Sequence, residues 1–407
     1  MRRLPPPLRR QDFRRFFVGQ SVSLLGDQVS LLAIPLTAVL VLHAGAGQLG
    51  LLTAAGVLPS LLFSLYAGAV VDRSGRRRQV MLLADILRGV AVLSLPLVYV
   101  LGSLTLTQLY VVAFVVGTLD VGFYVAYNAL IAAMVPREEL VSASSLVNGG
   151  RAMAGVVGLS IGGTLVAALT APGALLLDGV SFLASGLQLS RIRPPEPVVD
   201  PADQGLAKGA RWIAGSPLVR AMLASTATVN LFTFVINAIL VLYASRTLHL
   251  GPALIGLAFG AGALGGVLGA ATCPRLTRRI GLGPAFLTGS VLFPVPLLLF
   301  PLAHADAAFA LLVTGEFLSS IGVIWLDSTS GAIYGQQIPD ALRSRVSGAY
   351  RTVNYGVRPL GALLGGALGA TIGLRDTLWI GAAGASCSAL WLLRPAVLGL
   401  REPTPET

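Results

Sequence analysis

Apolar residues along this chain fall into long runs that short polar segments separate. Most runs reach the roughly 20 residues that a helix needs to cross the hydrocarbon core of a bilayer, although the sixth is short. They lie near residues 16–42, 49–71, 79–101, 105–132, 148–170, 174–190, 219–245, 253–273, 283–302, 305–333, 353–373 and 376–396. The pattern predicts an all-α integral membrane protein with twelve transmembrane helices.

The longest polar segment separates the sixth span from the seventh. It covers residues 191–216 and opens with arginines and prolines, which is typical of a linker. We therefore predict an N-terminal six-helix half at 1–190 and a C-terminal six-helix half at 217–396. The linker and the tail at 397–407 are predicted to be cytoplasmic.

The two predicted halves share a pattern of prolines and glycines. A shift of 203 residues places Pro136 on Pro339, Gly158 on Gly361, Gly163 on Gly366 and Asp27 on Asn230. Membrane helices are rich in glycine, so composition alone supplies some matches, but the constant offset favours a true repeat. Two pseudo-symmetric halves in one orientation place a substrate site between repeats near the membrane midplane.

Charge along the chain indicates topology. Only 12% of residues are charged, the mean hydropathy is +0.79, and the formal net charge is +11. The cations gather in loops and helix ends that alternate with loops almost free of them, as the positive-inside rule requires. We predict a multi-pass protein of the cytoplasmic membrane with both termini in the cytoplasm. The charge sets this topology, and we expect no nucleic-acid partner.

Four predicted spans carry polar residues at helical spacing on one face. They are the first and fourth spans of each half, and the stripes consist of Gln20, Ser23, Asp27 and Ser30; Gly117, Asp120, Tyr124, Tyr127 and Asn128; Thr226, Asn230, Thr233 and Asn237; and Glu316, Ser319, Ser320, Asp327 and Ser330. Polar groups inside a bilayer face a cavity or a partner. We predict that the cavity is lined by Gln20, Tyr124, Tyr127, Asn128, Asn230 and Asn237.

Three acids in these stripes are candidates for proton coupling or cargo binding, namely Asp27, Asp120 and Glu316. A carboxyl that is removed from water binds a proton more readily, so it can couple transport to a proton gradient. A purely structural role, hydrogen bonding between helices, is also compatible with each of them.

The other intramembrane charges have simpler interpretations. Asp85 and Arg88 are three residues apart and are predicted to neutralise each other. Asp178 is expected to be structural. Arg358 requires a partner, for which Glu316 and Asp327 are both candidates.

A short charged hinge joins the second and third spans at residues 68–78. Its pattern G-x-x-x-D-R-x-G-R-R-R resembles the signature loop of major facilitator superfamily transporters. This resemblance implies the twelve-helix fold, with the first and fourth helices of each half lining a central cavity. It also implies a conformational latch, whose partner is the start of span eleven and whose members are Gly68, Asp72, Arg73, Gly75 and Arg76.

Several segments resemble one branch of that superfamily, the enterobactin-exporter and macrolide-efflux-like permeases. They lie at 12–15, 23–27, 84–88, 135–140, 177–182 and 338–346. Two features depart from drug exporters: Asp120 stands where an arginine motif is frequent, and the proline of the span-five antiporter signature is missing between Gly158 and Gly162.

The resemblance implies a proton-coupled exporter of hydrophobic or amphiphilic small molecules such as antibiotics, secondary metabolites or siderophores. A proton-coupled nutrient importer, and a sensor or scaffold that transports nothing, are the alternatives. The sequence has no phosphate loop, nucleophile elbow or metal-ligand spacing, so we expect neither enzyme activity, metal nor cofactor. The expected partners are cargo, protons and lipid, and a single chain is expected to act as a monomer.

Overall fold

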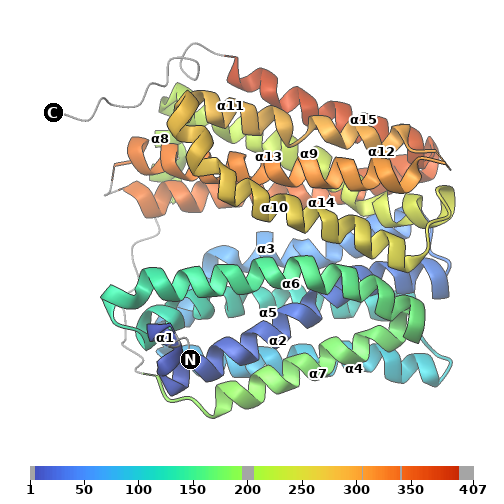
Figure 1. Ribbon diagram of the computed structural model, residues 1–407, viewed down its shortest axis with the longest axis horizontal. Helices are drawn as coiled ribbons and strands as arrows, with labels where there is room; N and C mark the ends of the chain where they lie inside the picture. The colour runs from blue at the N-terminus through green and yellow to red at the C-terminus, as the bar shows by residue number, and fades with distance from the viewer. Residues whose placement is uncertain (1–4, 195–205, 305, 340–341, 394–407) are drawn as a thin grey trace. The chain divides into compact units, whose positions relative to one another are not determined.

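The computed structural model describes residues 5–194, 206–304, 306–339 and 342–393, and this part of the chain is helical without any strand (Figure 1). Its helices follow the twelve predicted spans in order. The predicted N-terminal half contains α2 (Gln11–Leu36), α3 (Ala46–Ser74), α4 (Arg77–Val100), α5 (Leu106–Met134), α6 (Leu140–Leu169) and α7 (Ala171–Ser190), after the short α1 (Pro6–Arg9).

The predicted C-terminal half begins with α9 (Pro217–Leu242). It continues with α10 (Pro252–Ile280), α11 (Leu282–Leu292) with α12 (Leu299–Leu302), α13 (Ala308–Gln337), α14 (Arg343–Thr371) and α15 (Leu374–Ser386). In the described chain, ten helical segments are long and apolar enough to cross a membrane. Helices α14 and α15 fall outside that set; α14 contains several arginines, and α15 is a short helix that ends in a 3-10 turn.

The ends of α2 and α9 carry the same unusual turn. Each helix widens into a π-helical turn, at Thr37–Val41 and at Tyr243–Thr247. Each turn is followed by a histidine with left-handed backbone, with φ of 51° at His43 and 53° at His249. The structure thus repeats a local feature that the proline and glycine pattern did not include.

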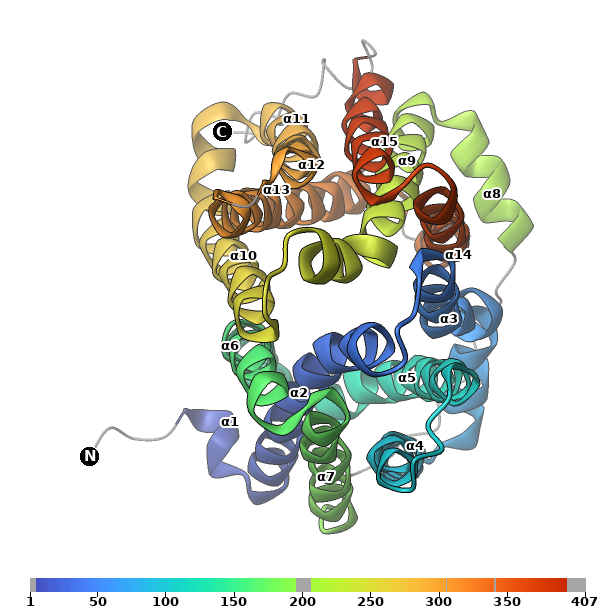
Figure 2. The same cartoon turned by 90° about the vertical axis from the view of Figure 1, so that its right-hand side faces the viewer.

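The described residues pack as two compact units. One takes in those within Met1–Ala44, Ala55–Ala202 and Gly251–Gly260, and the other those within Gly45–Ala54, Asp203–Leu250 and Ala261–Thr407. In the first unit α2 packs on α6 and α7, and α4 packs on α5 and α7; in the second, α9 packs on α14 and α15 (Figure 2).

Two helix crossings are close enough to require glycine. In the first unit, a Cβ added to Gly256 would lie 2.7 Å from Gly163 Cα, and in the second a Cβ added to Gly50 would lie 2.6 Å from Gly366 Cα. Atoms at that distance overlap, so the helices can cross this closely only because glycine has no Cβ. Gly163 and Gly366 are partners in the 203-residue repeat.

A helix also lies within the predicted linker, which the sequence analysis did not anticipate. Helix α8 (Leu206–Gly215) packs on α14 and α9, and the buried Ile213 joins an apolar cluster with Val219, Ile338 and Val346. Burial of this apolar face explains why a helix forms in an otherwise polar segment.

The hinge between α3 and α4 is the predicted tight turn. Helix α3 ends at Ser74, Gly75 has a φ of 57°, and α4 begins at Arg77. Left-handed backbone suits glycine because it has no Cβ. For the predicted latch residues Gly68, Asp72 and Arg73 the structure describes the backbone of α3 alone, while Arg76 is exposed at the start of α4.

Candidate functional site

Arg88 is the centre of a buried polar network in the first unit. It lies on α4 with 3% of its side chain exposed, and it donates hydrogen bonds to Asp85 on the same helix and to Asp120 on α5, the latter at 2.6 Å. The guanidinium carbon also lies 4.0 Å from the ring centre of Phe123 and 4.5 Å from that of Phe182. The predicted contact of Asp85 with Arg88 is present, and the same arginine also holds Asp120.

The network extends across the helix bundle through two neutral side chains. Ser185 of α7 donates to Asp85 Oδ2 at 2.7 Å, and Gln20 Nε2 of α2 donates to Ser185 Oγ at 2.8 Å. Gln20 is therefore buried inside the network. At the opposite end of the network, 51% of the Asp120 side chain is exposed. The hydrogen-bonded network therefore runs from the buried Gln20 to the accessible Asp120.

A second carboxyl of this unit, Asp178, is fully enclosed. Ser30 and Ser181 both donate to its carboxylate, which agrees with the structural role expected from the sequence. Asp27 lies one turn before Ser30 on α2 and is half-buried. Within the described residues, Asp27 has no hydrogen bond or salt bridge.

The polar face of α5 meets an arginine that the sequence analysis overlooked. The Arg151 guanidinium carbon, from α6, lies 5.3 Å from the ring centre of Tyr124 and 4.9 Å from that of Tyr127. Tyr127 is buried, whereas Tyr124 and Asn128 are exposed. The rarity of arginine inside membrane helices would have identified Arg151, because it lies within a predicted span.

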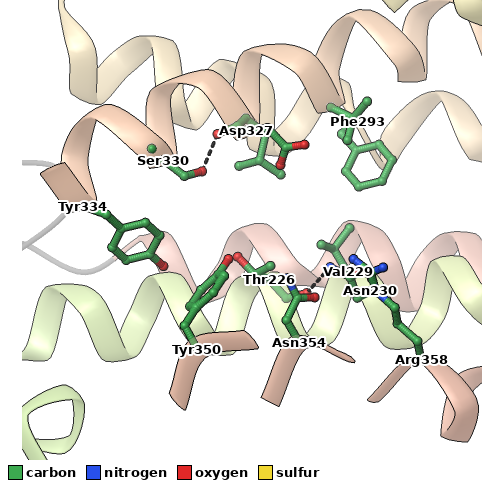
Figure 3. A pocket seen from close by; sticks show the side chains of 13 residues that line it. Thr226, Val229, Asn230, Phe293, Asp327, Ser330, Tyr334, Tyr350, Asn354 and Arg358 are labelled. Atoms are coloured by element: carbon green, nitrogen blue, oxygen red, sulfur yellow. Dashed lines mark hydrogen bonds between the residues drawn. The ribbon is translucent and has the colours of Figure 1, made fainter. Parts of the chain in front are cut away.

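The second unit contains a cavity of about 340 Å³ between α9, α13, α14 and Phe293, the residue that follows α11 (Figure 3). Its walls are formed by Thr226, Val229, Asn230, Phe293, Val323, Leu326, Asp327, Ser330, Gly331, Tyr334, Tyr350, Asn354 and Arg358. Of these residues, the sequence predicts Asn230 as a cavity residue and places Thr226, Asp327 and Ser330 in the same polar stripes. The spacing of Tyr350, Asn354 and Arg358, four residues apart, would have revealed the contribution of α14.

Arg358 has a different partner from either candidate that the sequence suggested. Its Nε donates to Asn230 Oδ1 at 3.1 Å, and Asn230 Nδ2 in turn donates to Thr226 O at 2.9 Å. Asp327 lines the cavity on α13 without a salt bridge among the described residues (Figure 3). The neutral amide reaches Arg358 because α9 and α14 pack directly on each other.

Glu316 and Asn237 do not line this cavity. Glu316 lies about three turns before Asp327 on α13 and faces Gly262 of α10, where an added Cβ would lie 3.1 Å from Glu316 Oε2. It is half-buried and has no hydrogen bond or salt bridge in the described part of the chain. Asn237 is exposed on α9.

Comparisons with known proteins place this geometry in a wider context. A family model described as a transmembrane secretion effector matches residues 5–403. The chain is 30% identical over 398 residues to the multidrug efflux pump Tap of Mycobacterium tuberculosis, covering 94% of this chain and 92% of Tap. It is 26% identical over 387 residues to the enterobactin exporter EntS of Citrobacter koseri, covering 88% and 85% of the two chains.

Among solved structures, a bacterial homologue of the iron transporter ferroportin in the inward-facing state superimposes with a TM-score of 0.75. The identity is 18%, and the alignment covers 94% of this chain and 98% of the homologue. At this identity the similarity establishes the fold.

Proposed function

Because the chain belongs to the transmembrane secretion effector family of the major facilitator superfamily, we propose that it exports hydrophobic or amphiphilic small molecules. The observation that carries the proposal is the similarity to a multidrug efflux pump along nearly the whole chain. The family resemblance that the hinge and branch segments predicted is confirmed. The protein is a multi-pass protein of the cell membrane, and the cytoplasmic position of both termini is part of the proposal.

The proposed driving force is proton entry. A carboxyl in a membrane-spanning helix carries a charge that costs about 2.5–3.5 kcal/mol at the helix centre unless it is paired or protonated. Asp27 and Glu316 lack a hydrogen bond or salt bridge within the described residues, so a proton would neutralise each of them.

Asp120 is suited to exchange its partner. Asp85 also neutralises Arg88, so Asp120 can release the arginine without leaving a buried cation unpaired. Its half-exposed side chain is open to a proton or to cationic cargo. These properties support Asp120 as a coupling or cargo residue.

The proposed cargo includes antibiotics, other secondary metabolites and siderophores, in line with the multidrug and enterobactin exporters that the chain resembles. We also propose that residues 1–190 and 217–396 form the two halves, that the protein acts as a monomer, and that the hinge at 68–78 serves as a conformational latch. The tight turn at Gly75, with its φ of 57°, supports the proposed latch.

Accumulation of a fluorescent amphiphile in expressing cells tests this function. We expect lower accumulation than in cells without the protein, and we expect a protonophore to abolish the difference. Higher accumulation that the protonophore abolishes would contradict export and favour an importer. Unchanged accumulation across a panel of amphiphiles of different charge would contradict the proposed cargo class.

Single variants then test the three acids. Asp27→Asn, Asp120→Asn and Glu316→Gln each remove a charge with little change of shape. Glu138→Gln is the matched control, because Glu138 is exposed in the 3-10 turn before α6. If all three variants keep full proton-driven export, the assignment of these acids is wrong.

A further inference from the structure

The cavity of the second unit presents opposite charges on opposing walls. Arg358 reaches it from α14 and Asp327 from α13, and Figure 3 shows the two side chains on opposite sides. They form no salt bridge with each other, although both lie in membrane helices where unpaired charge is costly. A molecule that contacts both groups would neutralise them together.

Arg358 is held in one orientation with its terminal nitrogens available. Asn230 accepts a hydrogen bond from Nε, and the guanidinium carbon lies 4.8 Å from the ring centre of Tyr355 and 5.4 Å from that of Phe234. The two Nη atoms have no hydrogen bond within the described residues. A planar guanidinium fixed in this way matches the paired oxygens of a carboxylate.

The other walls suit an aromatic body with hydrogen-bond donors. Phe293, Tyr334 and Tyr350 line the cavity, and the last two rings meet edge to face with centres 5.1 Å apart. Asn354 Oδ1 is buried and has no hydrogen-bond partner in the described chain, so it is an acceptor that a ligand can satisfy. A volume of about 340 Å³ is within the range of small-molecule sites.

We infer that this cavity binds an amphoteric aromatic small molecule, whose acidic oxygens contact Arg358 and whose protonated amine contacts Asp327. The inference rests on the proposed export function and specifies the class of its cargo. A molecule with only one of the two charges leaves either Arg358 or Asp327 uncompensated. The site therefore discriminates by the pairing of charges as well as by hydrophobicity.

Three fluorescent probes on one frame test this inference with the purified full chain in detergent. Norfloxacin carries both a carboxylate and a protonated amine. Its ethyl ester keeps only the amine charge, and its N-acetyl derivative keeps only the carboxylate. Fluorescence anisotropy gives the dissociation constant of each, and we expect norfloxacin to bind about tenfold more tightly than either derivative, since each lacks one charge-assisted contact.

Variants assign each preference to its wall. In Arg358→Gln, norfloxacin is expected to bind no more tightly than its ethyl ester. In Asp327→Asn, it is expected to bind no more tightly than its N-acetyl derivative. Arg351→Gln and Asp376→Asn are matched controls, because both residues lie outside the cavity lining, on α14 and α15. Each ratio compares the dissociation constants of two probes for the same variant, so a smaller amount of folded protein does not change it.

The inference is overturned if norfloxacin binds no more tightly than its derivatives, or if the two variants leave both ratios unchanged. Export is measured separately, as protonophore-sensitive efflux of norfloxacin from loaded cells. Binding preference without efflux would support the site and contradict the proposed function. Efflux without the preference would support the function and overturn the site.

Discussion

Asp85→Asn removes one of the two carboxylates that hold Arg88, in a position where both partners are buried. A hydrogen bond to a charged group contributes about 1.5–3 kcal/mol, and stranding a buried charge costs about 3–5 kcal/mol. Asp120 still contacts Arg88 in this variant, so we expect a loss near the lower figure, about 2–3 kcal/mol. Asp120→Asn alone is expected to cost about 1 kcal/mol or less, because Asp120 is half exposed.

The double variant is the decisive case. With Asp85→Asn and Asp120→Asn combined, Arg88, whose side chain is only 3% exposed, loses both carboxylates to which it donates hydrogen bonds. The combined loss is therefore expected to exceed the sum of the single losses by about 1–3 kcal/mol. A chain of this length is expected to shift its melting temperature by about 1–2 °C per kcal/mol, which makes the excess measurable.

Thermal unfolding can be followed with a thiol-reactive dye, because Cys273 is buried and free. Cys387 is exposed, so all variants are made in a Cys387→Ser background. Asp376→Asn is the control for a carboxylate outside the network. A double variant whose melting temperature equals the sum of the single shifts would refute the reasoning, since Arg88 would then owe its stability to other groups.

Three further predictions concern the backbone and the linker helix. Thr170, the N-cap of α7, has a φ of 74° and a ψ of 160°, and the 203-residue repeat pairs it with Gly373. Thr170→Gly should raise the melting temperature, because it relieves backbone strain of about 1–3 kcal/mol. The loss of the threonine cap costs only a few tenths of a kcal/mol. Gly256→Val should lower it by overpacking against Gly163, whereas Gly149→Val, in open space, should not. Ile213→Asp should release α8 and speed tryptic cleavage after Arg211, and unchanged cleavage would contradict the packing.

The sequence predicts the elements of this fold better than the contacts between them. Span length and polar spacing are local properties, so the helices and the pair Asp85–Arg88 follow directly from the order of residues. The link from Arg88 to Asp120, and that from Arg358 to Asn230, depend on which helices pack side by side. No local pattern contains that information.

The candidate sites show the same division. Asn230 of the α9 stripe lines the cavity, and Tyr334 and Asn354 join it from α13 and α14, helices that the pattern on α9 does not identify as its neighbours. Helix α8 was missed because its apolar face is short and lies among polar residues. The roles of Asp27, Asp120 and Glu316 stay predictions, since a position in a helix does not reveal which group exchanges a proton.

The close crossing of α3 and α14 has a consequence for biosynthesis. Gly50 and Gly366 meet in the second unit, yet the ribosome produces Gly366 more than 300 residues after Gly50. At about 5–20 residues per second, the first turns of α3 wait roughly 15–60 seconds for their native neighbour. During that interval the glycine surface of α3 faces lipid or the insertion machinery, and a bulky residue introduced there would meet its clash only as the last helices enter the membrane.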